Sequence, residues 1–194
     1  MTDWFAFLDL PCRPRLAESE IKERYLTLAA KLHPDASAGD TQAFGDLQQA
    51  FRGLSDPALR IRHLLALRFP GHPVSTGAMP PADLFMQVGP VLQQARAASQ
   101  KLERATSTLA RTLASLEVGE VLARLKSVRR AVEQTSQSLE ERLADLDQQW
   151  PEVAPGELAA WAGEWTFLAK WRAELAEWEF RLANAAPVPN VSAT

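Results

Sequence analysis

The sequence has few of the residues that build metal sites and disulfide bonds. Its 194 residues include one cysteine, Cys12, and three histidines. A single cysteine excludes an internal disulfide, a zinc ribbon and a cluster ligated only by cysteines of this chain. The histidines do not stand at a metal-ligand spacing with Cys12. We therefore expect a free structural thiol, no bound metal and no cofactor.

The sequence also lacks an excess of positive charge. Its 21 Lys and Arg side chains are balanced by 24 Asp and Glu, which gives a net charge of -3. Nucleic-acid-binding proteins usually carry a basic excess, so nucleic acid is not an expected partner. No stretch is apolar for long enough to span a bilayer, and the first ten residues do not resemble a secretory signal. These absences predict a cytoplasmic protein with no membrane partner.

Recognisable catalytic motifs are missing as well. The sequence has no glycine-rich phosphate loop and no Ser/His/Asp arrangement, so we expect a protein that is not an enzyme. What the sequence does have is a hydrophobic share of 46%, which is ordinary for a folded protein and too high for a disordered one.

Helical periodicity runs through almost the whole chain. Proline and glycine cluster at 70–81 and at 151–156, and strand-like alternation is absent. The pattern predicts an all-α protein. We divide it into a first domain at 1–68, a linker at 69–80, a bundle of long helices at 81–186 and a disordered tail at 187–194.

The first 68 residues show four helical segments: 4–8, 18–32, 41–54 and a fourth that starts at Pro57. Asp3 is placed to cap the first segment and Thr41 the third. Asp56 followed by Pro57 is a typical helix start. Pro34 ends the second segment, because proline disfavours helix in the residue before it.

Residues 81–186 predict three long helices in an antiparallel bundle, because short connections favour antiparallel neighbours. Three apolar stripes with spacings of three and four residues carry this prediction. We expect the first break at Gly119 and the second at 151–156. Pro90 predicts either a kink in the first long helix or a helix that starts only after it.

The most informative string is His33-Pro34-Asp35, which lies between the second and third helical segments. Taken alone, such a triplet is usually a helix stop with a polar turn. As a contact element it also makes sense, because proline stiffens the loop before binding and Asp35 offers a carboxylate to an arginine. His33 adds ring nitrogens that form hydrogen bonds.

The surroundings of the triplet resemble the J-domain family. Residues 21–35 read IKERYLTLAAKLHPD and residues 44–57 read FGDLQQAFRGLSDP. The resemblance implies a helical hairpin plus two short helices, with the triplet at the tip of the hairpin. It also implies a DnaK-type chaperone as partner, whose ATP hydrolysis the J-domain stimulates through His33, Pro34 and Asp35.

J-domains usually carry a basic face on the second helix. Here Lys22, Arg24 and Lys31 are present, while Leu26 and Thr27 stand where many relatives have Arg and Lys. Three cations on a helix usually mark only a solvated face. Next to the triplet, we expect them to face the chaperone, with weaker electrostatic steering than in a general J-protein.

The layout of the whole chain is similar to that of the HscB family of iron–sulfur assembly co-chaperones. The strings WFAFLDLP, DPALRIRHLLAL and MPPADLFMQ carry this similarity, together with residues 165–179. It implies an HscA-type chaperone and an IscU-type scaffold protein as client. The corresponding client-facing residues here are Leu84, Phe85, Met86 and Phe167. The acidic residues of the family's patch do not follow, and Gly89 and Pro90 stand where the family has Met and Glu. For Phe85, Met86 and Phe167, packing in the core is the alternative.

Tryptophan is abundant, with six residues. We expect core positions for Trp161, Trp165 and Trp178. Trp4 is expected to anchor the first helix and Trp150 to mark a helix end. Trp171 is expected either in the core or in a docking surface.

The alternative function is a J-like adaptor or self-associating protein without an iron–sulfur role. We expect a monomer or a weak dimer.

Overall fold

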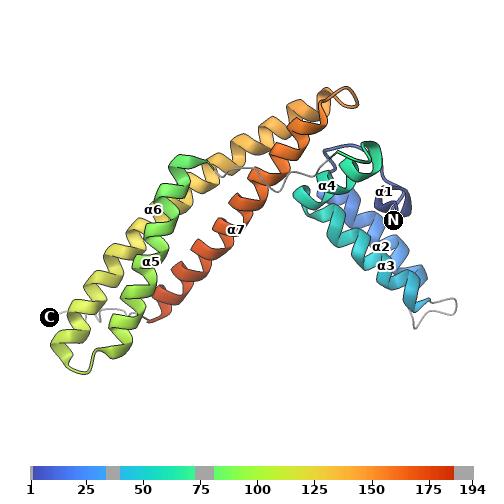
Figure 1. Cartoon of the computed structure of the whole chain (residues 1–194). Coiled ribbons are helices and arrows are strands. Elements are labelled where there is room, and N and C mark those ends of the chain that lie inside the picture. Colours follow the sequence, from blue (N-terminus) through green and yellow to red (C-terminus); the bar gives the residue numbers. More distant parts are fainter. Residues whose placement is uncertain (1, 34–39, 73–80, 186–194) are drawn as a thin grey trace. The chain divides into compact units, whose positions relative to one another are not determined.

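The computed structural model describes residues 2–33, 40–72 and 81–185, and every regular element in these ranges is a helix (Figure 1). The all-α prediction is confirmed, with four helices before residue 70 and three long ones after it. None of the described helices is long and apolar enough to cross a membrane. The helices are α1 (Trp4–Phe7), α2 (Glu18–Leu32), α3 (Thr41–Ser55), α4 (Pro57–Arg68), α5 (Ala82–Arg104), α6 (Thr108–Gln148) and α7 (Pro155–Ala185).

The chain forms two compact units. The first combines residues 1–78 with 138–166, and the second combines 79–137 with 167–194. Helices α6 and α7 therefore each contribute to both units. The first unit thus includes part of the segment that the sequence pattern assigns to the bundle.

Helix starts in the first unit follow capping chemistry. The Asp3 carboxylate accepts hydrogen bonds from the backbone N–H groups of Phe5 and Ala6 at 2.9 and 3.2 Å. The Asp56 carboxylate accepts from the N–H of Leu59 at 3.0 Å, with proline at the first helical position. Both predicted caps are confirmed.

The predicted cap at Thr41 is wrong by one residue. Asp40 caps α3 instead, and its carboxylate accepts from the N–H of Gln42 at 2.8 Å. Thr41 is already the first residue of the helix. Both residue types favour the cap position, so their order in the sequence did not decide which of them would serve.

Helices α2 and α3 form an antiparallel hairpin. The rings of Tyr25 and Phe51 stack near its base with centroids 4.2 Å apart, and the rings of His33 and Phe44 meet edge to face at its other end, 5.3 Å apart. The hairpin core, completed by α1 and α4, consists of buried apolar side chains that include Phe5, Leu8, Ile21, Leu47, Leu54, Ile61 and Leu64. Burial of such side chains is the main stabilising contribution to this unit.

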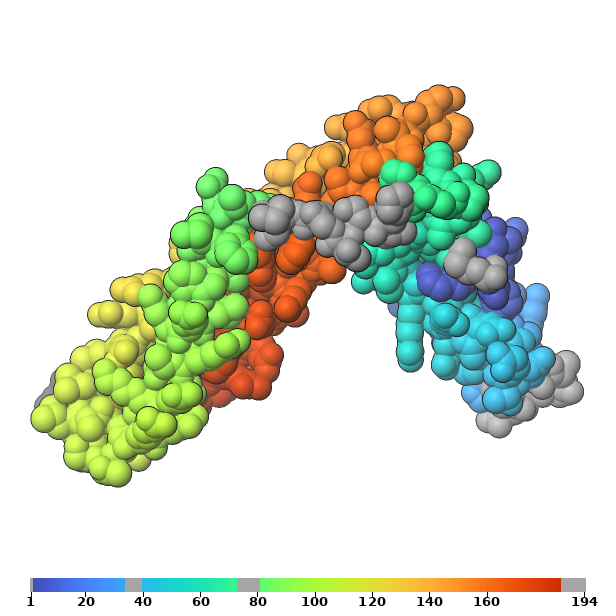
Figure 2. All heavy atoms as spheres, in the orientation of Figure 1, coloured from blue at the N-terminus to red at the C-terminus, as the bar shows by residue number. Residues whose placement is uncertain are grey.

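In the second unit α6 runs antiparallel to α5. Arg124 of α6 donates to Gln94 of α5 at 3.0 Å, and Lys101 of α5 pairs with Glu117 of α6. The later residue of α5 therefore pairs with the earlier residue of α6, so the two helices run in opposite directions. Side chains fill the gaps that the ribbons leave in this bundle (Figure 2).

Helix α7 runs antiparallel to α6 by the same argument. Arg129 of α6 pairs with Glu179 at 2.9 Å, and Arg172 of α7 with Glu133 at 3.7 Å. The predicted antiparallel three-helix bundle is confirmed.

The predicted break at Gly119 is wrong. Gly119 lies inside α6, and the turn between α5 and α6 falls at 105–107. The Ser107 hydroxyl accepts from the N–H of Ala110 at 3.1 Å, which caps the new helix. An interior glycine costs a helix only about 1 kcal/mol relative to alanine, and packing in the bundle offsets that amount.

Pro90 lies inside α5, which begins at Ala82. The alternative that the helix starts only after Pro90 is therefore wrong. Pro90 is exposed, so its ring displaces no core side chain.

The tryptophan predictions hold in part. Trp161 is fully buried, stacks on the buried Trp165, and donates its indole N–H to the backbone oxygen of Leu139 at 2.7 Å. Trp171 is also buried, which settles its assignment as core. Trp178 is only half-buried, with the Arg181 guanidinium 5.3 Å from its ring centroid, so the core prediction for Trp178 is wrong.

Candidate functional site

His33 stands directly after α2, at the open end of the hairpin. Its backbone N–H donates to the oxygen of Ala29 at 3.0 Å, which closes the last turn of the helix. Its side chain is exposed, with the ring edge against Phe44. Contact with α3 therefore orients the imidazole while leaving it accessible. Pro34 and Asp35 lie outside the described residues.

The three cations of α2 do not form one patch. Lys22, Arg24 and Lys31 are all exposed. At 3.6 residues per turn, Lys22 and Lys31 lie on opposite edges of the exposed face, and Arg24 shares the edge of Lys31. The Arg24 guanidinium also pairs with the Asp9 carboxylate at 3.2 Å. Both partners are exposed, so this pair contributes little to stability.

The strip between these edges holds Leu26, Thr27 and the exposed Glu23. Leu26 lies one turn after Lys22 and is 55% exposed. The Thr27 hydroxyl donates to the backbone oxygen of Glu23 at 2.9 Å, so it is already engaged within the helix. The exposed face of α2 is therefore less basic than its lysine content indicates.

Two buried side chains that the sequence analysis did not single out hold the first unit together. The His63 ring stacks on the Trp4 ring at 4.0 Å, and its Nε2 accepts the backbone N–H of Trp4 at 3.0 Å. Burial lowers the pKa of His63. The buried Arg60 guanidinium donates to the backbone oxygens of Pro14 and Leu54 at 2.9 and 2.7 Å, and burial lowers the pKa of Arg60 to about 10.

A third such residue is Asp147, near the end of α6. Its carboxylate is 8% exposed and accepts from Arg13 through a bidentate ion pair. It also accepts the backbone N–H of Arg15 at 3.0 Å. The hydrogen bond with Asp147 raises the pKa of Arg13. The segment that leads into α2 is thus fixed by a residue far along the chain, and no local pattern reveals such a partner.

The residues predicted to bind a client divide by burial. Leu84 is 5% exposed and belongs to the core, whereas Phe85 and Met86 are 60% and 72% exposed at the start of α5. The core alternative is therefore wrong for Phe85 and Met86, and burial of Leu84 in the core speaks against its predicted place on the client-facing surface. Phe167 is half-buried on α7, with its ring 6.1 Å from that of Trp171.

Two exposed regions stand out among the described residues, and none of these residues forms a metal site. Within the described ranges, no cluster of three or more His, Cys, Asp or Glu residues could hold a metal ion. Cys12 is a free, half-buried thiol. The two regions are His33 at the end of α2 and the pair Phe85 and Met86 at the start of α5, all of which are exposed.

Comparison with known proteins agrees with this geometry. Residues 3–63 match the DnaJ domain family. Protein SIS1 of Saccharomyces cerevisiae is 43% identical over 47 residues, which cover 24% of this chain and 13% of that protein. The co-chaperone protein HscB homolog of Paraburkholderia phymatum is 38% identical over 95 residues, which cover 43% of this chain and 53% of the relative. The matched regions thus span about half or less of these relatives.

The similarity of fold extends further than the similarity of sequence. The structure of the chaperone HscB from Vibrio cholerae superposes with a TM-score of 0.60 at 18% identity. That match covers 93% of this chain and 99% of the other, including the long helices. Residues 3–63 are therefore a J-domain, within a chain that is HscB-like in its fold.

Proposed function

We propose that this protein is a cytoplasmic J-domain co-chaperone, which stimulates the ATPase of a DnaK/HscA-type chaperone through His33, Pro34 and Asp35. The observation that carries the proposal is the position of His33 within the J-domain match: exposed, at the end of α2, and oriented by Phe44 of α3. ATP hydrolysis takes place on the chaperone, and this chain acts by contact.

The hairpin suits a contact of this kind. The stacked pair Tyr25 and Phe51 and the buried leucines of α3 join the two helices, so the end of α2 has little freedom to lose on docking. Proline after His33 restricts the backbone further. The Asp35 carboxylate is the group that we assign to an arginine of the chaperone.

The two edges of α2 contribute differently to electrostatic attraction of the chaperone. Lys22 shares its helix edge with Leu26 and the position of His33, whereas Arg24 is engaged with Asp9. We infer that Lys22 contributes most of the electrostatic attraction on the His33 side. A single cation increases the association rate only modestly.

For the client we propose an iron–sulfur scaffold protein of the IscU type, bound through Phe85 and Met86. Large apolar side chains that are more than half exposed are frequent in protein interfaces. The relatives described above are named HscB. The client assignment rests on the likeness to them and on this exposed pair.

The chaperone proposal is tested with Asp35→Asn in an assay of chaperone ATPase stimulation. We expect loss of stimulation with unchanged helical circular dichroism, because a single charge at the loop is removed. Asp145→Asn is the matched control, since it makes the same change at an exposed position of α6 and should leave stimulation intact. Full stimulation by Asp35→Asn would refute the assignment.

The client proposal is tested by titrating purified scaffold protein against the full chain. Phe85→Ala combined with Met86→Ala should weaken binding by at least about tenfold, because two exposed anchors are removed. Phe180→Ala removes a side chain that is 71% exposed on α7 and serves as the control. A double variant that binds as tightly as the parent, or a parent that does not bind, would reject this client site.

A further inference from the structure

An exposed leucine stripe runs along the first part of α6. It consists of Leu109, Leu113 and Leu116, which are 71%, 55% and 65% exposed. Spacings of four and three residues place them on one face of the helix, away from the buried Ala114 and Val118. Isolated exposed leucines are common, but three in succession on one face indicate an interface.

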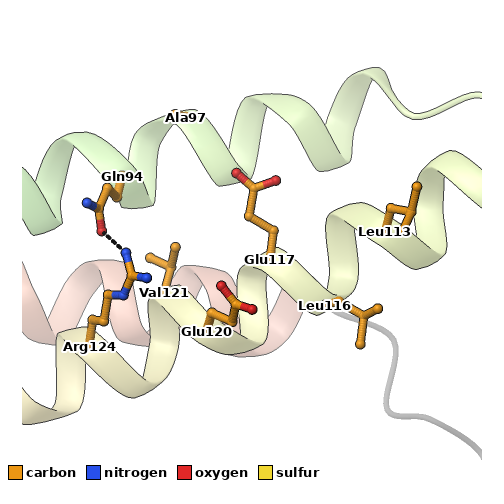
Figure 3. Close-up of a pocket in the computed structure, with 8 residues that line it drawn as sticks. All are labelled: Gln94, Ala97, Leu113, Leu116, Glu117, Glu120, Val121 and Arg124. Atoms are coloured by element: carbon orange, nitrogen blue, oxygen red, sulfur yellow. Dashed lines mark hydrogen bonds between the residues drawn. The ribbon is translucent and has the colours of Figure 1, made fainter.

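The stripe borders a shallow groove between α5 and α6. Leu113 and Leu116 line it together with Gln94 and Ala97 of α5, and Glu120 follows one turn later along α6 (Figure 3). Of the charged residues that line the groove, Glu117 pairs with Lys101 and Arg124 donates to Gln94.

We propose that the leucine stripe binds the same stripe of a second copy of this chain, in an antiparallel arrangement about a two-fold axis at Leu113. Such an axis sets Leu109 of one copy beside Leu116 of the other and Leu113 against itself. Every leucine of the stripe then meets a leucine. Self-complementarity of this kind is what a two-fold interface requires.

The charges at the two ends of the stripe match as well. Ser107 caps α6 just before Leu109, so the free N–H groups of a long helix lie at this end. Glu120 lies at the opposite end and makes no ion pair within the described part of the chain. The antiparallel arrangement places the Glu120 carboxylate of each copy beside the positive N-terminus of the other copy's α6, which is favourable and occurs twice.

The size of the stripe limits the strength of this association. A stable dimer buries about 800 Å² on each partner, and three leucines with their neighbours offer less. The dimer is therefore weak and forms only as the concentration rises. This inference concerns the second unit alone and does not depend on the chaperone function proposed above.

Sedimentation equilibrium of the full chain at increasing concentration tests the proposal. The average mass should rise from that of the monomer toward twice that value. Leu113→Glu should abolish the rise, because two carboxylates would face each other at the axis, and Glu120→Lys should weaken it several-fold. Met86→Glu, at a side chain that is 72% exposed elsewhere in the same unit, should not change it. A monomer at all concentrations, or a dimer indifferent to Leu113→Glu, would overturn the proposal.

Oxidative cross-linking supplies an independent test of the axis. In a Cys12→Ser background, Leu113→Cys should form a disulfide between two copies, whereas Met86→Cys should not. Preferential cross-linking through Met86→Cys would overturn the arrangement. Removal of residues 187–194 should leave the dimer unchanged; if truncation were needed for dimerisation, the tail would be the occupant of the stripe and the proposal would be wrong.

Discussion

Arg13, in the segment before α2, forms a bidentate ion pair with Asp147 of α6, a residue 134 positions later in the sequence. The same carboxylate accepts the backbone N–H of Arg15. One buried acid from the long helices thus secures the segment that leads into α2.

Asp147→Asn should therefore destabilise the first unit. It removes the charge-assisted bonds of a carboxylate that is 8% exposed, while the Arg13 side chain is 46% exposed and partly screened by water. We expect a loss of about 1–2 kcal/mol in the free energy of unfolding. Urea unfolding of the full chain measures it. Asp145→Asn, at an exposed position on the same helix, should change stability by less than about 0.5 kcal/mol.

Stability should also fall as the solution becomes mildly acidic, because of His63. Burial lowers its pKa in the folded protein, and Nε2 accepts the Trp4 N–H only when it carries no proton. Below the ordinary histidine pKa of about 6.5 the unfolded chain binds the proton more readily, so the folded state loses stability as the pH falls. Asp3, the nearest acid, opposes the shift but does not reverse it.

The measurement for His63 is a series of urea unfolding curves between about pH 7.5 and pH 5.5, above the range in which ordinary carboxylates titrate. His63→Gln should reduce the slope of stability against pH. An equal slope in the parent and the variant would contradict the role assigned to His63.

Two glycines of α3 should respond in opposite ways to alanine. A Cβ at Gly53 would overlap the six-membered ring of Trp4, whereas a Cβ at Gly45 would meet nothing within 4 Å. Gly53→Ala should therefore destabilise by about 1–3 kcal/mol through overpacking. Gly45→Ala should stabilise by up to about 1 kcal/mol, because alanine is the better helix former. Thermal unfolding of the pair checks both signs, and a stabilised Gly53→Ala would contradict the packing described for Trp4.

Lys22→Glu should slow association with the chaperone, with an effect of about threefold to tenfold at low salt that shrinks as salt is added. Lys170→Glu places the same charge change on α7 and should have no effect. Association rates at two ionic strengths make the comparison. A salt-independent loss would indicate that Lys22 acts by packing rather than by charge.

Local chemistry made much of the fold predictable. The caps at Asp3 and Asp56, the stop before Pro34 and the helix 18–32 all depend on residues close together in the chain, where side-chain geometry and proline sterics act directly. The His33-Pro34-Asp35 string was recognised by the resemblance of its surroundings to the J-domain family, and of its three residues the structure describes His33, directly after α2.

Where two local signals competed, only the structure decided between them. Gly119 has the lower helix propensity, yet α6 continues through it and the chain turns at Ser107 instead. The exposure of Phe85 and Met86 beside the buried Leu84 is a similar case. Three adjacent apolar side chains on a helix point in three directions, and the position of the neighbouring helices determines which of them is covered.

The sequence by itself determined the helical class and most helix boundaries, because these arise from interactions between near neighbours, and it carries the strings that resemble the J-domain family. The tertiary structure decided that Asp147 holds Arg13, that His63 accepts from Trp4, and that three leucines of α6 remain uncovered. Each of these depends on which distant segments pack together. Packing is a property of the whole chain, because the burial of one face is set by every element that competes to cover it.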